Sequence, residues 1–93
     1  MDQTARADRS LGYQQITATG SPVGFIVPNT CTLAVVVIEA QAVRYRDDGV
    51  DPTVSVGMPV AVGATLRYTA AQMSQVRFIA QTAGAIVNVT YYG

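Results

Sequence analysis

A run of β-branched side chains is the feature that most limits how this chain can fold. Val35, Val36, Val37 and Ile38 follow one another inside an apolar segment that extends from Leu33 to Ile38. β-Branched residues lose side-chain freedom on a helix and pack well on a pleated sheet. The segment is therefore predicted to be a strand. Because it is apolar on both faces, we expect it to be buried between two layers.

This strand is predicted to belong to a hairpin on which the rest of the chain packs. The first arm covers residues 33–46, and the second covers residues 53–58. Between them lies a polar connection, residues 47–52, in which Gly49 can supply the positive φ that a turn needs. Small residues at 39–42 predict a bend or bulge within the first arm.

The second arm shows the alternation of a half-buried strand. Val54, Val56 and Met58 alternate with small or polar residues, and we expect these three side chains to face the core. Pro59 is predicted to end the strand, because proline has no backbone N–H to donate.

Segments of strand character recur along the chain and are separated by turn residues. Their spacing of about 8–12 residues, without helical periodicity, is typical of a sandwich or a small barrel. The sequence therefore predicts an all-β fold, a small antiparallel β-sandwich or jelly-roll-like barrel of about seven or eight short strands. Outside the hairpin, the predicted strands are Tyr13–Ala18, Thr65–Tyr68, Gln75–Ala80 and Ala85–Tyr92.

The chain is predicted to form one β-sandwich domain, residues 11–93, preceded by a flexible N-terminal arm, residues 1–10. The arm is polar and contains Arg6 and Arg9. Two interpretations stay open: a frayed tail, or an extended arm that becomes ordered on a neighbouring subunit.

Composition excludes several classes of protein. The net charge is zero, with six basic and six acidic residues, so a nucleic-acid partner is not expected. No apolar run is long enough for a membrane span, and the N-terminus lacks the apolar core of a signal peptide.

Cys31 is the single cysteine, predicted to be a small buried hydrophobe in a protein made in a reducing cytoplasm. With 49% hydrophobic and only 13% charged residues, part of the surface is expected to be covered in an oligomer.

The chain has few residues with which to perform a reaction. It contains no His, no Lys and one Cys, so catalytic triads, zinc sites and Schiff-base chemistry lack their components. The sequence therefore predicts a non-enzymatic protein with no catalytic residue, no metal and no cofactor.

Acidic residues cluster in one predicted turn. The spacing of Asp47, Asp48 and Asp51 does not match a calcium-binding loop. A carboxylate pair of Glu39 with one of them, as in glycoside hydrolysis, is interpreted as chance. We interpret the turn as solvated, with its carboxylates offsetting the neighbouring arginines.

Five residues are candidates for a partner interface. Arg44 and Arg46 share one face of a predicted strand, where they could be exposed beside the acidic turn or anchor a partner. Arg6 and Arg9 are candidates in the arm. Tyr92 is either a partly exposed tyrosine or a ring that packs on a partner or a sugar.

The second half of the chain, about residues 33–92, resembles small virion proteins of tailed bacteriophages. The resemblance lies in turn-and-strand motifs. These are Val43–Gly49, Pro52-Thr53, Gly57–Val60 with Gly63 and Leu66, Val76–Ala80, and Val87–Tyr92.

The resemblance implies a capsid decoration or cement protein. Such a protein would bind the phage major capsid protein and copies of itself, as a homo-oligomer such as a trimer, and would be located in the virion after synthesis in the host cytoplasm. The alternative is a carbohydrate-binding or adaptor module of a phage tail or fibre, with Tyr45, Tyr68 or Tyr92 as a stacking platform.

Overall fold

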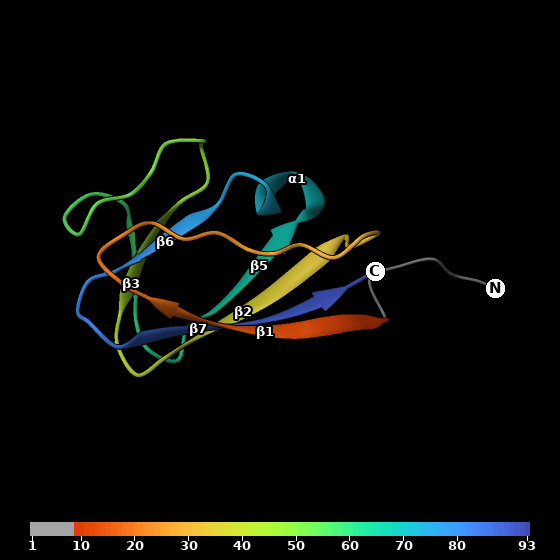
Figure 1. Cartoon of the computed structure of the whole chain (residues 1–93), viewed down its shortest axis with the longest axis horizontal. Coiled ribbons are helices and arrows are strands. Elements are labelled where there is room, and N and C mark those ends of the chain that lie inside the picture. Colours follow the sequence, from red (N-terminus) through yellow and green to blue (C-terminus); the bar gives the residue numbers. More distant parts are fainter. Residues whose placement is uncertain (1–8) are drawn as a thin grey trace.

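The computed structural model describes residues 9–93, which form two antiparallel sheets facing each other (Figure 1). The first sheet has four strands, in the order β1 (Ser10–Ala18), β7 (Ala85–Tyr92), β2 (Leu33–Glu39) and β5 (Thr65–Thr69). The second has three, in the order β4 (Met58–Val60), β3 (Val43–Arg46) and β6 (Arg77–Ala80). A single short helix, α1 (Ala70–Met73), follows β5 in the described part of the chain.

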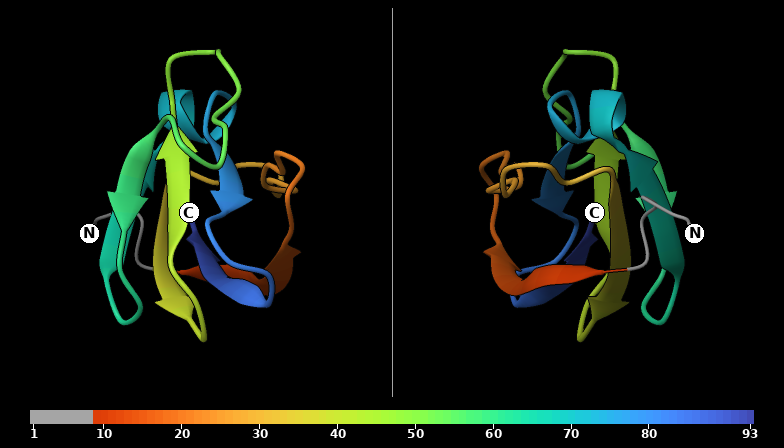
Figure 2. Two further views of the ribbon diagram at one scale, coloured as in Figure 1. Left: turned by 90° about the vertical axis from the view of Figure 1, so that its left-hand side faces the viewer. Right: turned by 90° about the vertical axis from the view of Figure 1, so that its right-hand side faces the viewer.

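The predicted fold class, an all-β antiparallel sandwich, is confirmed. End-on views show the strands wrapped around one interior (Figure 2). The predicted arm, residues 1–10, lies outside the described residues except for Arg9 and Ser10, and β1 already begins at Ser10. Arg6 lies outside the described residues as well.

The chain changes sheets between β2 and β3. Ala40 has a φ of 74°, and the N–H of Gln41 donates to the carbonyl of Glu39 at 2.9 Å. The bend predicted at residues 39–42 is therefore present. The predicted hairpin is wrong in its first arm, because β2 and β3 lie in different sheets and only β3 pairs with β4.

The prediction that β2 is buried on both faces is also wrong. Val36 and Ile38 are buried in the core, whereas Val37 on the other face is 39% exposed. β2 lies between β7 and β5 within its sheet, but the opposing sheet covers only the inner face. β2 is therefore a half-buried strand, although its sequence is apolar on both faces.

The largest error concerns residues 53–58, which form a loop up to Gly57. Val54 and Val56 are 53% and 54% exposed, although their alternation predicted a core face. The Arg44 guanidinium donates to the carbonyls of Val54 at 3.2 Å and Gly57 at 2.9 Å, so these backbone acceptors are bound by a side chain instead of a ladder.

Strand β4 begins where the predicted strand was expected to end. Pro59 lies inside β4 and pairs with Arg44. β4 is an edge strand, where a missing backbone donor costs least. Met58, at its start, is 58% exposed and does not face the core.

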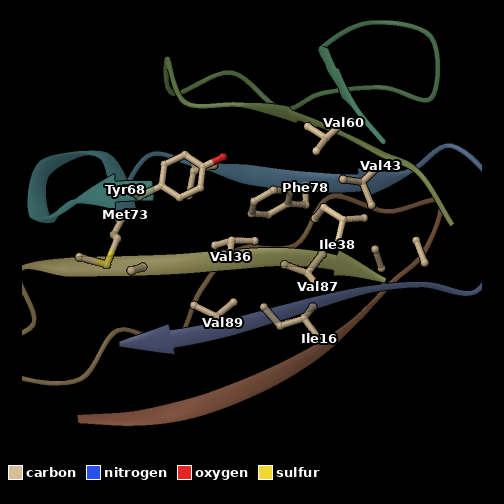
Figure 3. Packing of buried hydrophobic residues seen from close by; sticks show 14 of the residues in the cluster. Ile16, Val36, Ile38, Val43, Val60, Tyr68, Met73, Phe78, Val87 and Val89 are labelled. Carbon is tan, nitrogen blue, oxygen red and sulfur yellow. The ribbon is translucent and has the colours of Figure 1, made fainter. Parts of the chain in front are cut away.

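Aromatic rings join the two sheets at the centre of the core. Phe78 on β6 is completely buried, and its ring centroid lies 5.5 Å from Phe25, 6.1 Å from Tyr45 and 6.1 Å from Tyr68. Figure 3 shows Phe78 above the aliphatic side chains of β2 and β7, among them Ile38. Aromatic pairs at this separation stabilise beyond the area that they bury.

We expect Phe78→Ala to lower the free energy of unfolding by about 3–5 kcal/mol, because it leaves a cavity between the sheets. A domain of this length has only about 5–14 kcal/mol in total. Urea denaturation followed by circular dichroism measures the loss.

The matched control is Val54→Ala in the exposed loop, which should change the same free energy by less than about 0.5 kcal/mol. Equal losses in the two variants would contradict this assignment of the core.

Candidate functional site

The sheets have four edge strands, and β1 is the least protected of them. Edge strands present unpaired backbone groups to other chains unless charges, prolines or covering segments block them. β4 has three residues and contains Pro59. β5 has five and carries Arg67. β6 is bridged by Val23, whose N–H and C=O both bond to Phe78 at 2.8 Å.

Strand β1 has neither a charge nor a proline, and its one irregularity among the described residues is a register shift between Ser10 and Gly12. It has nine residues, SLGYQQITA. It pairs with β7 on one side only. Its outer side is therefore a long row of backbone donors and acceptors on which another strand could pair.

A groove lies beside β1, where the segment after Val23 passes over the first sheet. Its volume is about 300 Å³, the lower end of the range for small-molecule sites. Its lining is mostly apolar and contains no charged side chain. The lining residues are Leu11, Gly12, Tyr13, Gln14, Ile26, Pro28 and Tyr91.

Gln14 fixes the shape of this groove. Its Oε1 atom accepts hydrogen bonds from the backbone N–H of Ile26 at 3.1 Å and from the hydroxyl of Tyr91 at 2.5 Å. A backbone N–H can only donate, so the oxygen of the Gln14 amide must face Ile26. The covering segment is thereby attached to both β1 and β7.

A polar ladder holds the solvent face of β1 against its neighbours. Asn88 on β7 accepts from the hydroxyl of Tyr13 and, at 3.3 Å, from Nε2 of Gln15. Its own amide donates to Oε1 of Glu39 at 2.9 Å. Tyr13 remains 61% exposed, so the edge of the sheet presents an aromatic ring to solvent.

Two buried tyrosines differ in how their hydroxyls are satisfied. The hydroxyl of Tyr68 is buried without a partner among the described residues, whereas the hydroxyl of Tyr91 bonds to Gln14. Burial, the largest cause, raises the pKa of Tyr68 strongly, and Tyr45 and Asp47 add to this rise. Burial likewise raises the pKa of Tyr91 to about 12.

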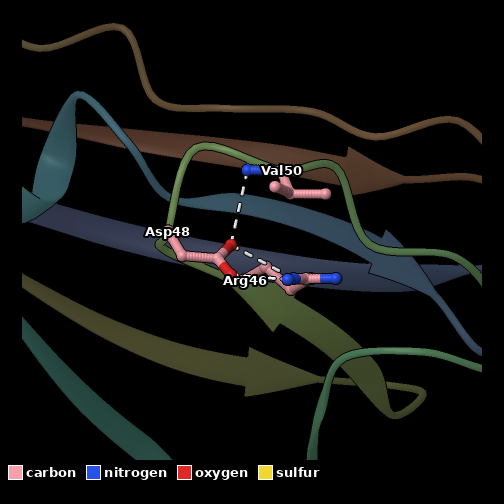
Figure 4. A network of polar contacts seen from close by, with 3 residues as sticks. All are labelled: Arg46, Asp48 and Val50. Carbon is pink, nitrogen blue, oxygen red and sulfur yellow. Dashed lines mark hydrogen bonds and ion pairs between the residues drawn. The ribbon is translucent and has the colours of Figure 1, made fainter.

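The arginines predicted for an interface have partners within the chain. Arg46 and Asp48 form an ion pair at 2.5 Å, and Asp48 also accepts from the N–H of Val50 (Figure 4). The hydrogen bond between the two side chains lowers the pKa of Asp48 and raises that of Arg46. Arg44 holds the neighbouring loop, as described above.

The structure does not bring the predicted interface residues together. Arg44 and Arg46 lie on β3 of the second sheet, whereas Tyr92 is half-buried on β7 of the first. Arg9 is exposed, and its carbonyl accepts from the N–H of Gly93 at 2.9 Å. Whether any of these residues contacts a partner stays a prediction.

Two of the three tyrosines predicted as a stacking platform, Tyr45 and Tyr68, pack in or against the core, and the third, Tyr92, is half-buried. Tyr68 is 3% exposed, and the ring of Tyr45 packs against it with centroids 5.9 Å apart. Sequence reasoning instead missed Gln14 and Ile26. The signal that could have indicated their surroundings is the absence of charge and proline from residues 10–18.

Within residues 9–93, no group of three or more His, Cys, Asp or Glu side chains is placed to hold a metal ion. In the same range, no helix is long and apolar enough to cross a membrane.

Comparison with known proteins identifies the fold. No protein-family model matches the chain, and no curated protein matches its sequence. Among solved structures, the chain is similar to an RmlC-like cupin protein from Desulfovibrio desulfuricans, with a TM-score of 0.55 and 16% identity over 99% of this chain and 92% of that one. The chain therefore has a cupin-like β-sandwich fold. At this identity the likeness concerns the fold alone, and a fold does not define an activity.

This match overturns the resemblance to tailed-phage virion proteins. The predicted capsid decoration protein, and its alternative as a tail or fibre module, are wrong, because the whole chain superimposes on a cupin-like fold. The motifs behind the resemblance were turns and strands of a kind that many β domains share. The capsid-protein partner and the virion location were derived from that resemblance, and the fold tests neither.

The tyrosine hydroxyls lead to opposite expectations for two matched variants. Tyr91→Phe should lower the free energy of unfolding by about 0.5–1.5 kcal/mol, because it removes the bond to Gln14. Tyr68→Phe removes a buried hydroxyl that has no partner, so stability should stay unchanged or rise by about 1 kcal/mol. Urea denaturation of both proteins measures the difference. A larger loss of stability in Tyr68→Phe than in Tyr91→Phe would show that the Tyr68 hydroxyl does have a partner.

The same tyrosines should make the fold sensitive to alkali. Both pKa values are raised from 10.0, so the folded state favours the protonated phenols. This contribution is complete below the pKa of an unfolded tyrosine, about 10. It is lost as the pH rises toward the pKa of Tyr91, about 12.

Urea denaturation at a series of pH values, with tyrosinate absorbance recorded in parallel, checks this expectation. The double variant Tyr68→Phe/Tyr91→Phe should lose most of the decline in stability above about pH 10. An undiminished decline in that variant would show that other groups are responsible.

Proposed function

We propose that this chain is a non-catalytic interaction module that associates with a second copy of itself through the β1 edge. The observation that carries the proposal is the edge itself: nine residues without charge or proline, paired on one side only. Strand addition to such an edge is a recurring mode of protein recognition, in which main-chain hydrogen bonds supply much of the affinity.

Two copies of β1 can pair in an antiparallel manner around a two-fold axis. Such an interface is isologous, because each copy contributes the same surface. The first sheet would then continue into the first sheet of the partner. The zero net charge of the chain means that no long-range repulsion opposes the approach.

The residue content supports a role without catalysis. The chain has no His or Lys, and its single cysteine, Cys31, is buried beside Met73, with the two sulfur atoms 3.7 Å apart. Structural cysteines that are buried in this way are inert.

A pair of lysines at the edge tests the proposal. Gln15 and Thr17 are exposed residues on the solvent face of β1, and the substitutions remove one long hydrogen bond, from Gln15 to Asn88 at 3.3 Å, so Gln15→Lys/Thr17→Lys should leave the fold intact. Across a two-fold antiparallel interface the introduced charges repel each other. Sedimentation equilibrium should show a concentration-dependent dimer for the unmodified chain and a monomer for this variant.

The matched control places the same two lysines on the other edge of the first sheet. Thr65→Lys/Arg67→Lys on β5 also places two lysines at exposed positions two residues apart, and this variant should remain dimeric. An unmodified chain that stays monomeric at all concentrations would refute the proposal. A dimer that persists in the β1 variant would place the interface elsewhere.

A further inference from the structure

The groove beside β1 combines apolar walls with one polar group of fixed orientation. Its walls are mainly the side chains of Leu11, Ile26, Pro28 and Tyr91, and no charged side chain lines its volume of about 300 Å³. A groove of this kind favours a ligand with an apolar body, since burial of that body is the main source of affinity.

The polar group is the side-chain amide of Gln14. Its oxygen already accepts from Ile26 and Tyr91, so both usual acceptor positions are occupied. No described residue accepts a hydrogen bond from its NH₂ group, which carries two donors. The amide can therefore offer a donor to a bound molecule without giving up a bond within the protein.

We propose that this groove binds a small uncharged molecule that carries a carbonyl group on an aliphatic body. The carbonyl would accept from the Nε2 atom of Gln14, and the aliphatic part would lie against Leu11, Ile26 and Pro28. A carboxylate fits less well, because its charge would leave water without a cation in the groove to compensate. An ammonium ion fits less well again, because it carries only donors and faces the donors of Gln14.

This site does not depend on the proposed self-association. It uses the side chains of Gln14, Ile26 and Tyr91, whereas strand pairing uses the outer backbone groups of β1. The monomeric edge variant, Gln15→Lys/Thr17→Lys, therefore allows the two proposals to be tested separately.

Three probes of the same shape test the ligand chemistry: isovaleramide, isovalerate and isoamylamine. In NMR titrations of the ¹⁵N-labelled chain, isovaleramide should cause saturable shifts at Gly12–Gln14, Ile26 and Tyr91. Isovalerate and isoamylamine should bind at least about tenfold more weakly, a difference of roughly 1.4 kcal/mol. The unmodified chain and the edge variant should bind the three probes in the same order of affinity.

The matched variant is Gln14→Glu, which keeps the oxygen that accepts from Ile26 and Tyr91 but loses the donors. It should bind isovaleramide about tenfold more weakly and should come to prefer isoamylamine. Ile26→Asp changes a residue that is 77% exposed, so it tests the groove without affecting the core, and it should abolish binding of isovaleramide.

Three results would overturn the ligand site. They are the absence of saturable shifts with all three probes, equal binding of amide and carboxylate, and an unchanged order of preference in Gln14→Glu. Binding of isovaleramide by an unmodified chain that is monomeric would refute self-association alone and leave the ligand site in place.

Discussion

The contact of aromatic rings around Phe78 is the interaction on which the rest of the molecule depends. Phe78 lies on β6, and its neighbours Tyr45 and Tyr68 come from β3 and β5, so one cluster links both sheets. Phe25 adds a ring from a segment that has no strand of its own. That ring draws the chain between β1 and β2 across the sandwich, and thereby holds Ile26 and Pro28 over the end of β1. The groove is a consequence of how the core is packed.

Strands could be predicted from the sequence where the alternation of apolar and polar residues reflects burial of one face of the strand. The bounds of β7 agree with the prediction, because Val87, Val89 and Tyr91 alternate with more polar residues and are buried. Residues 53–58 alternate just as regularly and yet form mostly a loop. The backbone groups of this loop bond to one another, between Thr53 and Val56, and to the guanidinium of Arg44. No periodicity reveals such a contact between residues in different elements.

The candidate site was still less accessible to sequence reasoning. Gln14, Ile26 and Tyr91 meet only because β1 pairs with β7 and the intervening segment folds back over both. Arg44 and Arg46 were predicted for an interface because they share one face of a strand and arginine often anchors partners, but both bind groups within the chain. The phage resemblance failed for a related reason. The spacing of glycines, valines and tyrosines in turns and strands predicts that a chain forms a β-sandwich. It does not predict which family of β-sandwich the chain resembles.

The position of β7 affects how the protein can be made. β7 follows every other strand in the chain, yet it lies between β1 and β2 in the first sheet. A ribosome releases a chain N-terminal end first, at about 5–20 residues per second. Throughout that time β1 has no partner in its sheet, and β2 lacks one of its two. Completion of the first sheet must therefore wait until translation has passed Tyr92, and until then the nascent chain carries the uncharged β1 unpaired.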